Sequence, residues 1–315
     1  MKKKSVFIFL KILFVALIII IILSNPKMTG NSIFNLGNFN FNFSGMLLFI
    51  SLFGLIFVFS LEKHLSEEEY TTERGEYRGI KYKIYRAEND KGRVVLIAPG
   101  MGPRELESSS TIKVLAEQLA RKGVSSISFE IQQDEEAPPP RRIIEDYLSM
   151  AQLAKKEGYD NIYGLYGSSL SAGPALVAAG KLGVKHIALR APLVYFHELF
   201  SEAVTQRGGK LEDALGEWRK KGRIPKGRNT VPYELYEQFA ETDVSKVADR
   251  LKGTRIEITH GTKDDVVPIK YVEKACEKLK EAGAYVRFDR IEGAGHDFDR
   301  SQQKYAVRRL RKSLT

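Results

Sequence analysis

The feature that most limits the possible folds is a regular alternation of strand-like and helix-like segments after residue 75. Residues 93–98 read RVVLIA, a continuous apolar run of the kind found in strands buried on both faces. Comparable strand patterns are predicted at residues 124–131, 161–166, 184–190, 255–260 and 285–291. Repeated strand–helix units predict an α/β fold with a doubly wound, mostly parallel sheet and right-handed crossovers.

Helical spacing fills most of the intervals between these strands. The predicted helices are residues 110–122, 141–157, 171–181, 269–282 and 299–312. Residues 77–87 alternate apolar and polar side chains, which predicts an antiparallel strand near a sheet edge. Residues 192–251 interrupt the strand–helix alternation with helical fragments joined by Gly- and Pro-rich turns. We therefore expect a helical cap inserted at about residues 192–251 into a domain that spans residues 75–315.

Two long apolar runs precede this domain. Residues 6–23 are broken only by Lys11, and residues 45–61 contain no charge. Because a helix of about 20 residues crosses the hydrocarbon core of a bilayer, these runs predict two transmembrane helices. Residues 1–61 then form a membrane hairpin whose turn is an Asn- and Phe-rich interfacial loop, and residues 62–74 form a linker. A secretory signal peptide and a pair of buried core helices are the alternative interpretations.

The charges near these runs predict how the hairpin is oriented. The loop between the runs carries a single basic residue, Lys27, whereas basic residues flank both outer ends. These flanking residues are Lys2, Lys3, Lys4, Lys63, Arg74, Arg78, Lys81 and Lys83. The positive-inside rule then places both ends in the cytoplasm. We expect a multi-pass protein of the cell membrane whose C-terminal domain faces the cytoplasm.

The composition argues against several other classes of protein. The net charge is +10, and residues 1–61 hold five basic residues and no acidic ones. No nucleic-acid-binding motif accompanies the remaining mild excess, so we expect no nucleic-acid partner. The single cysteine, Cys276, lies in a helical pattern and is predicted to be a buried core residue. The histidines lack metal-ligand spacing and no phosphate-binding fingerprint occurs, so we expect no metal and no cofactor.

Three serines follow the predicted strand 161–166, in the sequence Gly167-Ser168-Ser169-Leu170-Ser171. A nucleophile elbow is a G-x-S-x-G turn between a strand and a helix, and its strained backbone requires small residues on both sides of the nucleophile. Gly167 supplies the first small residue, and Ser171 stands where a second glycine is usual. Ser169 is thus the predicted nucleophile. In the alternative register the nucleophile is Ser171, and a helix-capping serine is the plain structural interpretation.

Two later segments carry the other residue types that activate a serine. THGTKDDVVP, residues 259–268, follows one predicted strand, and EGAGHDF, residues 292–298, follows the next. The order serine, aspartate, histidine, each after a strand, resembles that of the α/β-hydrolases across about residues 75–315. The esterase and prolyl-oligopeptidase-like branch of that superfamily is the most similar, with a cap after the sixth strand.

The resemblance implies a role for each of these residues. Ser169 matches the nucleophile, and His296 matches the general base that takes the serine proton and returns it to the leaving group. Asp264 matches the acid that orients the imidazole, with Asp265 as its neighbouring rival. The VVP that follows fits the spacing of the family better when Asp264 is the acid.

The resemblance also implies an oxyanion hole built from backbone N–H groups. One donor is the N–H of Leu170, directly after the nucleophile. The second comes from the loop PGMG after residues 93–98, where relatives often have His-Gly. The N–H of Met101 is the predicted donor from that loop.

These features together predict a membrane-tethered serine hydrolase that cleaves carboxylic esters. The expected substrate is a small-molecule or lipid ester, such as a monoacylglycerol or a lysophospholipid, because the hairpin would hold the active site close to the bilayer. A peptidase or a thioesterase would use the same triad. A non-catalytic, membrane-anchored scaffold that keeps the fold is the alternative from a different class.

Overall fold

The computed structural model describes residues 70–101, 110–131, 137–226 and 229–315, together with residues 33–36, 39–42 and 54. The chain divides into two compact units, Met1–Glu69 and Tyr70–Thr315.

In the first unit, strands β1 (Ile33–Leu36) and β2 (Phe39–Asn42) pair in an antiparallel hairpin. The sequence predicts a loop here, whereas the Phe–Asn alternation of β2 has the two-residue period of a strand. The predicted membrane spans, residues 6–23 and 45–61, lie outside the described residues, apart from Gly54. Among the helices that the structure describes, none combines the length and the apolar character needed to cross a membrane.

The second unit alternates strands and helices from Tyr70 onward. In chain order its elements are β3 (Tyr70–Tyr77), β4 (Ile80–Ala87), β5 (Arg93–Ala98), α4 (Ser110–Ala120), β6 (Ser125–Phe129), α5 (Pro140–Lys156), β7 (Asn161–Ser168), the 3-10 turn η3 (Ser169–Ser171), α6 (Ala172–Leu182), β8 (His186–Arg190), α7 (Phe196–Gln206), α8 (Leu211–Lys221), β9 (Arg223–Lys226), β10 (Asn229–Pro232), α9 (Tyr233–Phe239), α10 (Val244–Val247), η4 (Ala248–Leu251), β11 (Arg255–Gly261), α11 (Ile269–Glu281), β12 (Tyr285–Ile291) and α12 (Arg300–Ser313).

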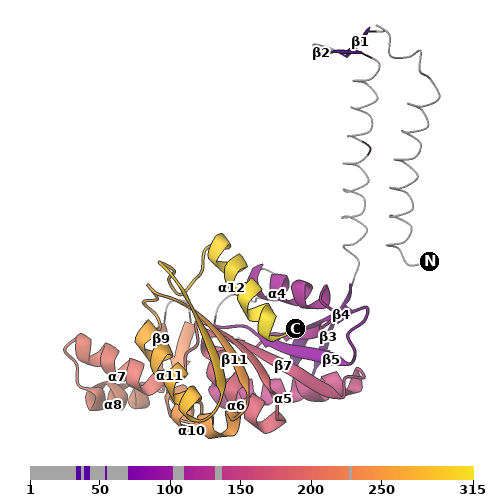
Figure 1. Ribbon diagram of the computed structural model, residues 1–315. Helices are drawn as coiled ribbons and strands as arrows, with labels where there is room; N and C mark the ends of the chain where they lie inside the picture. The colour runs from indigo at the N-terminus through magenta and orange to yellow at the C-terminus, as the bar shows by residue number, and fades with distance from the viewer. Residues whose placement is uncertain are drawn as a thin grey trace. The chain divides into compact units, whose positions relative to one another are not determined.

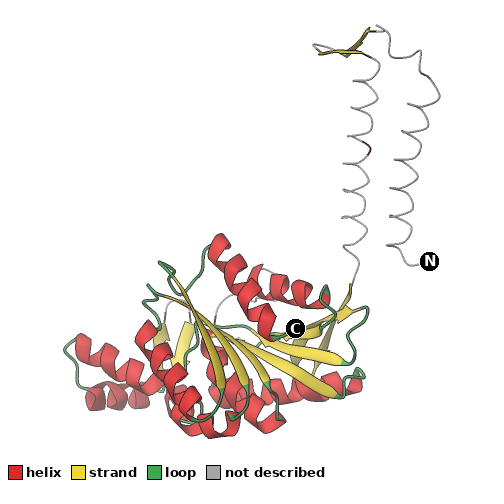
Figure 2. Ribbon diagram, in the orientation of Figure 1, coloured by secondary structure: helices red, strands yellow, loops and turns green. Residues whose placement is uncertain are grey.

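The central sheet of this unit has the strand order β12–β11–β8–β7–β5–β6–β4–β3. Neighbouring strands from β12 to β6 are parallel, and β4 and β3 add an antiparallel margin. The strands form a twisted fan with helices on both sides (Figure 2). Helices α4 and α12 cover one face, and α5, α6 and α11 cover the other (Figure 1). The predicted α/β fold with a mostly parallel sheet is confirmed.

The core consists of two apolar layers, one on each face of the sheet. Strand β5 shows the reason, because Val94, Leu96 and Ala98 pack into one layer whereas Val95 and Ile97 pack into the other. All five side chains are fully buried. A strand that lies between two apolar layers therefore reads as a continuous hydrophobic run.

The antiparallel margin differs from the sequence prediction. Residues 77–87 are predicted as one strand, but β3 ends at Tyr77 and β4 begins at Ile80. The two residues between them, Arg78 and Gly79, have φ values of 53° and 79°. Positive φ at both central positions is typical of a tight hairpin turn. Strand β3 also begins at Tyr70, inside the predicted linker 62–74.

The interval between β8 and β11 holds helices α7, α8, α9 and α10 and the short hairpin β9–β10. Its interior is an aromatic cluster in which Phe196 stacks on Phe239, with ring centroids 4.2 Å apart. Trp218 packs against Phe200 and donates a hydrogen bond to the Val231 carbonyl at 3.0 Å. Most of the aromatic side chains between β8 and β11, in the predicted cap, thus pack against one another.

Candidate active site

The serine stretch lies at a sharp turn at the carboxyl end of β7. This strand lies between β5 and β8 near the middle of the sheet, and ligands of open α/β sheets bind outside the carboxyl ends of the strands. Ser169 has φ of +49°, a strained value for a residue with a side chain. A Cβ at Gly167 would lie 2.8 Å from the Ser171 carbonyl oxygen. The turn therefore needs glycine at position 167.

The three serines differ in exposure and in hydrogen bonding. Ser168 and Ser171 are buried, whereas Ser169 is partly exposed. The Ser171 hydroxyl accepts a bond from the Ser168 N–H at 2.9 Å and lies 3.3 Å from the Ala98 carbonyl oxygen. Ser171 thus braces the turn from inside the core, which argues against the register in which it is the nucleophile.

The structure brings the serine, the histidine and the aspartate of the three motifs together. The Ser169 hydroxyl lies 3.0 Å from Nε2 of His296. On the other side of the ring, Nδ1 of His296 lies 2.8 Å from Oδ2 of Asp264. The three side chains thus form a continuous hydrogen-bonded chain, although they come from the ends of three different strands.

The surroundings of Asp264 keep its carboxylate ionised, so that it accepts hydrogen bonds. Asp264 is 6% exposed, and its Oδ1 accepts the N–H groups of Val266 and Val267 at 3.0 and 2.8 Å. Burial raises the pKa of this carboxyl, but the bonds from His296 and Val267 outweigh burial and hold the pKa below its ordinary value. Asp264 is therefore ionised at neutral pH. Its rival Asp265 is exposed.

The loop that carries His296 packs closely on the end of β11. A Cβ at Gly261 would lie 2.3 Å from the Ala294 carbonyl oxygen, so no larger residue fits there without moving the loop. The Lys263 N–H donates to the same carbonyl at 2.8 Å. The segments that carry His296 and Asp264 are thus held together by backbone contact as well as by their side chains.

Two buried residues beside the triad, His260 and Arg190, are not among the site residues predicted from the sequence. His260 has Nε2 at 2.8 Å from the Val267 carbonyl oxygen and 3.4 Å from Oδ2 of Asp264. Burial lowers the pKa of His260, so its imidazole is neutral at pH 7. The signal for His260 is its place four residues before Asp264. The other residue is Arg190, at the end of β8, for which the sequence holds no recognisable signal.

The predicted oxyanion donors belong to segments that adjoin Ser169. Leu170 lies in the first turn of the helical segment, where backbone N–H groups have no partner within the helix. Met101 follows Gly100, and a Cβ built on Gly100 would lie 3.2 Å from the Ser169 Cβ. Gly100, in the described part of this loop, thus lies directly against the turn at Ser169. Residues 102–109, which continue this loop, lie outside the described residues.

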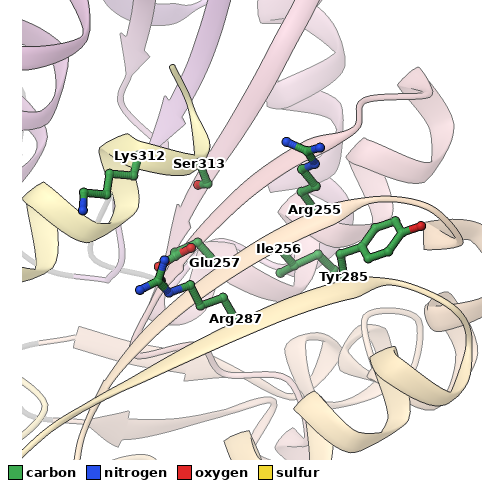
Figure 3. Close-up of a pocket in the computed structure, with 7 residues that line it drawn as sticks. All are labelled: Arg255, Ile256, Glu257, Tyr285, Arg287, Lys312 and Ser313. Carbon is green, nitrogen blue, oxygen red and sulfur yellow. Dashed lines mark ion pairs between the residues drawn. The ribbon is translucent and has the colours of Figure 1, made fainter.

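A separate cavity of about 410 Å³ opens at the amino ends of β11 and β12, at the opposite end of the strands from the triad (Figure 3). Arg255 and Tyr285, the first residues of β11 and β12, line it together with Glu257 and Arg287. An ion pair of 3.5 Å joins the last two residues. Because the triad follows the last residues of its strands, this cavity lies about a strand length, roughly 20 Å, from the triad.

Within residues 70–101, 110–131, 137–226 and 229–315, no cluster of three or more His, Cys, Asp or Glu side chains could hold a metal ion. Cys276 is buried in α11, as predicted.

No protein-family model matches the sequence. No curated protein matches it at a significant level.

Solved structures do resemble the chain. Est1E from Butyrivibrio proteoclasticus has 17% identity and a TM-score of 0.58, with 76% of this chain and 96% of that chain covered. A hypothetical protein from Pseudomonas aeruginosa has 15% identity and a TM-score of 0.59, with 78% and 94% covered. An alpha-beta serine hydrolase homologue from Coxiella burnetii has 17% identity and a TM-score of 0.50, with 78% and 97% covered. The chain has the α/β-hydrolase fold.

Proposed function

We propose that the protein is a serine hydrolase that cleaves carboxylic esters, with Ser169 as nucleophile, His296 as general base and Asp264 as orienting acid. The observation that carries the proposal is the hydrogen-bonded chain of these three side chains, at 3.0 and 2.8 Å, on a turn where Ser169 has positive φ. Support also comes from neighbours of the same fold. Est1E has been solved with ferulic acid bound, and the Coxiella burnetii protein is named a serine hydrolase homologue.

The proposed reaction follows from the proton positions that this chain favours. The Asp264 carboxylate accepts the Nδ1–H of His296, which leaves Nε2 free to accept the Ser169 proton. The Ser169 oxygen attacks the ester carbonyl carbon while its proton moves to Nε2. The C–O bond to the alcohol then breaks, and the alcohol leaves with that proton. Water attacks the acyl-enzyme by the same route and releases the acid.

The charge that develops on the carbonyl oxygen requires donors at fixed positions. The backbone N–H groups of Leu170 and Met101 are the proposed pair. A donor of this kind contributes about 100- to 1,000-fold to kcat, because it is aimed at the oxyanion before the reaction begins.

The experiment that tests the triad is labelling of the full-length protein with a fluorophosphonate probe. Wild type and Ser171→Ala are expected to label, because the Ser171 hydroxyl only braces the turn. Ser169→Ala and His296→Ala are expected to lose labelling. An unlabelled wild type whose fold is intact by circular dichroism would contradict the proposal and would favour a non-catalytic scaffold.

We further propose that the predicted hairpin, residues 1–61, tethers the enzyme to the cell membrane with the hydrolase unit in the cytoplasm, and that the ester is lipid-derived. The two charge-poor runs and the basic residues that flank them support the tether. Retention in the membrane fraction after carbonate washing, together with a C-terminal reporter active only in the cytoplasm, is the expected result. Release by carbonate would contradict the tether.

The substrate class can be tested separately. In detergent, monoacylglycerols and lysophospholipids are expected to be cleaved with higher kcat/KM than short soluble esters. Matched thioester and amide substrates distinguish a thioesterase or a peptidase from an esterase. If short esters were cleaved well and long acyl chains were ignored in every detergent, the lipid assignment would be wrong while the triad assignment would stand.

A further inference from the structure

Arg190 occupies the position between the nucleophile strand and the acid strand. It is the last residue of β8, where it is the register partner of Ser168 in β7 and of Thr259 in β11. Arg190 is only 9% exposed. Among the described residues, no carboxylate lies within ion-pair distance of its guanidinium. Burying a cation without a carboxylate is costly, so the contacts that hold this one need a physical explanation.

The guanidinium joins the two halves of the triad. Its Nη1 donates to the Ser168 hydroxyl at 3.1 Å, and its Nη2 donates to the His296 carbonyl at 3.1 Å. Its plane lies over the Phe298 ring at 4.5 Å. One planar group thus connects the residue before the nucleophile to the main chain of the base and to the residue two positions after it.

The other backbone bonds between this loop and the end of β11 lie before His296. The Thr262 N–H donates to the Ile291 carbonyl at 3.1 Å, and the Lys263 N–H donates to the Ala294 carbonyl at 2.8 Å. Arg190 is the donor that holds the His296 carbonyl itself. Without this bond, the backbone hydrogen bonds that tie this loop to the end of β11 would all lie before His296.

We propose that Arg190 is a positioning residue that sets the distance between the Ser169 hydroxyl and Nε2 of His296. The inference rests on the proposed hydrolase function and adds to it a residue that acts through the base. The planar fork is essential to this role, because its two Nη groups reach two fixed acceptors at once. A lysine ammonium is a point charge that cannot span both acceptors in one rigid geometry.

Arg93 provides a matched control at the amino ends of the strands of the same sheet. Its guanidinium also donates to two main-chain carbonyls, those of Gly123 and Thr315, both at 3.3 Å, and lies over the Tyr163 ring at 5.2 Å. It is the first residue of β5, so these contacts lie at the opposite end of the strands from the triad. Arg93→Met removes a similar set of contacts without touching the base.

The test compares Arg190→Met, Arg190→Lys, Ser168→Ala and Arg93→Met with wild type in the full-length protein. The readouts are kcat and KM on one ester substrate, the fluorophosphonate labelling rate and the melting temperature. Arg190→Met is expected to lower kcat and the labelling rate by about 10- to 100-fold, with KM within about threefold, because a misplaced base slows chemistry more than binding. Arg190→Lys is expected to recover only part of this loss. Ser168→Ala, which removes one acceptor but keeps the bond to His296, is expected to lower kcat less than Arg190→Met does, and Arg93→Met is expected to keep the wild-type kcat.

Chemical rescue separates positioning from general stability. In Arg190→Gly, about 50 mM guanidinium chloride, far below denaturing concentrations, is expected to restore part of the labelling rate by occupying the vacated position. The same addition is expected to leave wild type, Arg93→Met and His296→Ala unchanged. Recovery of labelling at an unchanged melting temperature is a result that a merely structural role would not produce.

The outcomes are separable from those of the proposed function. If wild type labels and Ser169→Ala does not, the triad stands and only the Arg190 results decide the inference. Arg190→Met with wild-type kcat, or equal kcat losses in Arg190→Met and Arg93→Met, would overturn it. If Arg190→Met does not fold, wild-type kcat in a folded Arg190→Lys would overturn it equally. If wild type itself never labels, the inference falls together with the proposed function.

Discussion

Replacing Gly261 with alanine should separate His296 from Asp264 without changing any side chain of the proposed triad. Gly261 is the last residue of β11, and the His296 loop lies directly against it. A Cβ at this position would meet the carbonyl oxygens of Ala294 and Gly295 at 2.3 and 2.6 Å. Both contacts are with backbone atoms, so no change of rotamer can relieve them.

The geometry gives the size of the effect. Ordinary contact of a Cβ begins at 3.4 Å, so the 2.3 Å contact requires a displacement of about 1.1 Å. The Lys263 N–H donates to the Ala294 carbonyl at 2.8 Å and resists this movement. Because Asp264 follows Lys263, part of the displacement is passed to the turn that carries Asp264. A misplacement of about 1 Å in a catalytic group lowers the rate about 100-fold. Overpacking of this kind also destabilises a fold by about 1–3 kcal/mol.

The measurement is the second-order rate of fluorophosphonate labelling, with the melting temperature recorded for each variant. The matched control is Gly295→Ala in the same loop, where a Cβ would meet its nearest neighbour, the Lys263 carbonyl oxygen, at 3.9 Å. We expect Gly261→Ala to label about 100-fold more slowly than wild type. We expect Gly295→Ala to label within about threefold of wild type, as is usual where a new side chain has room. Wild-type labelling and an unchanged melting temperature in Gly261→Ala would refute the reasoning.

Three further predictions follow from single side chains. Asp264→Asn is expected to lower kcat by about 10,000-fold at neutral pH, because an amide can hold the wrong tautomer of His296; a kcat within tenfold of wild type would contradict the assigned acid. Burial raises the pKa of Asp146 to about 6 from an ordinary 3.8, so its protonated form is favoured in the fold and stability is lost as pH rises from about 4 to 6. Arg142, whose Nε lies 3.0 Å from Asp146, offsets burial only in part. Wild type should therefore lose about 3 kcal/mol of stability between pH 4 and pH 8 that Asp146→Asn does not lose, as measured by urea denaturation at both pH values. Burial raises the pKa of the Cys276 thiol to about 11, so iodoacetamide should modify it only when the protein unfolds, which mass spectrometry can follow in native and denaturing buffer.

The sheet is predictable from the sequence because its strands are buried on both faces. Continuous apolar runs such as residues 93–98 have few alternatives once helical segments separate them. The antiparallel margin is less predictable. The turn at Arg78 and Gly79 divides what reads as one alternating run, and only the Arg-Gly pair signals it. Strand β3 is polar and mostly exposed, so its sequence lacks the apolar pattern that marks the other strands.

The site is predictable to the extent that it depends on local turns. Ser169, Asp264 and His296 each lie in a segment whose small residues and position after a strand can be recognised one at a time. Arg190 cannot be found in this way, because its role depends on strand order. Arg190 reaches the His296 carbonyl only because β8 lies between β7 and β11. A sequence records neither that order nor the register that pairs Arg190 with Ser168.

The distances of the triad are set by backbone packing more than by the triad side chains. The strained turn at Ser169 fixes the proposed nucleophile, the close approach at Gly261 fixes the loop of His296, and the guanidinium of Arg190 connects the two across β8. The turn at Ser169 and the close approach at Gly261 require only small residues at defined positions. The proposed connection through Arg190 depends on one specific side chain, because a planar guanidinium reaches both of its acceptors at once.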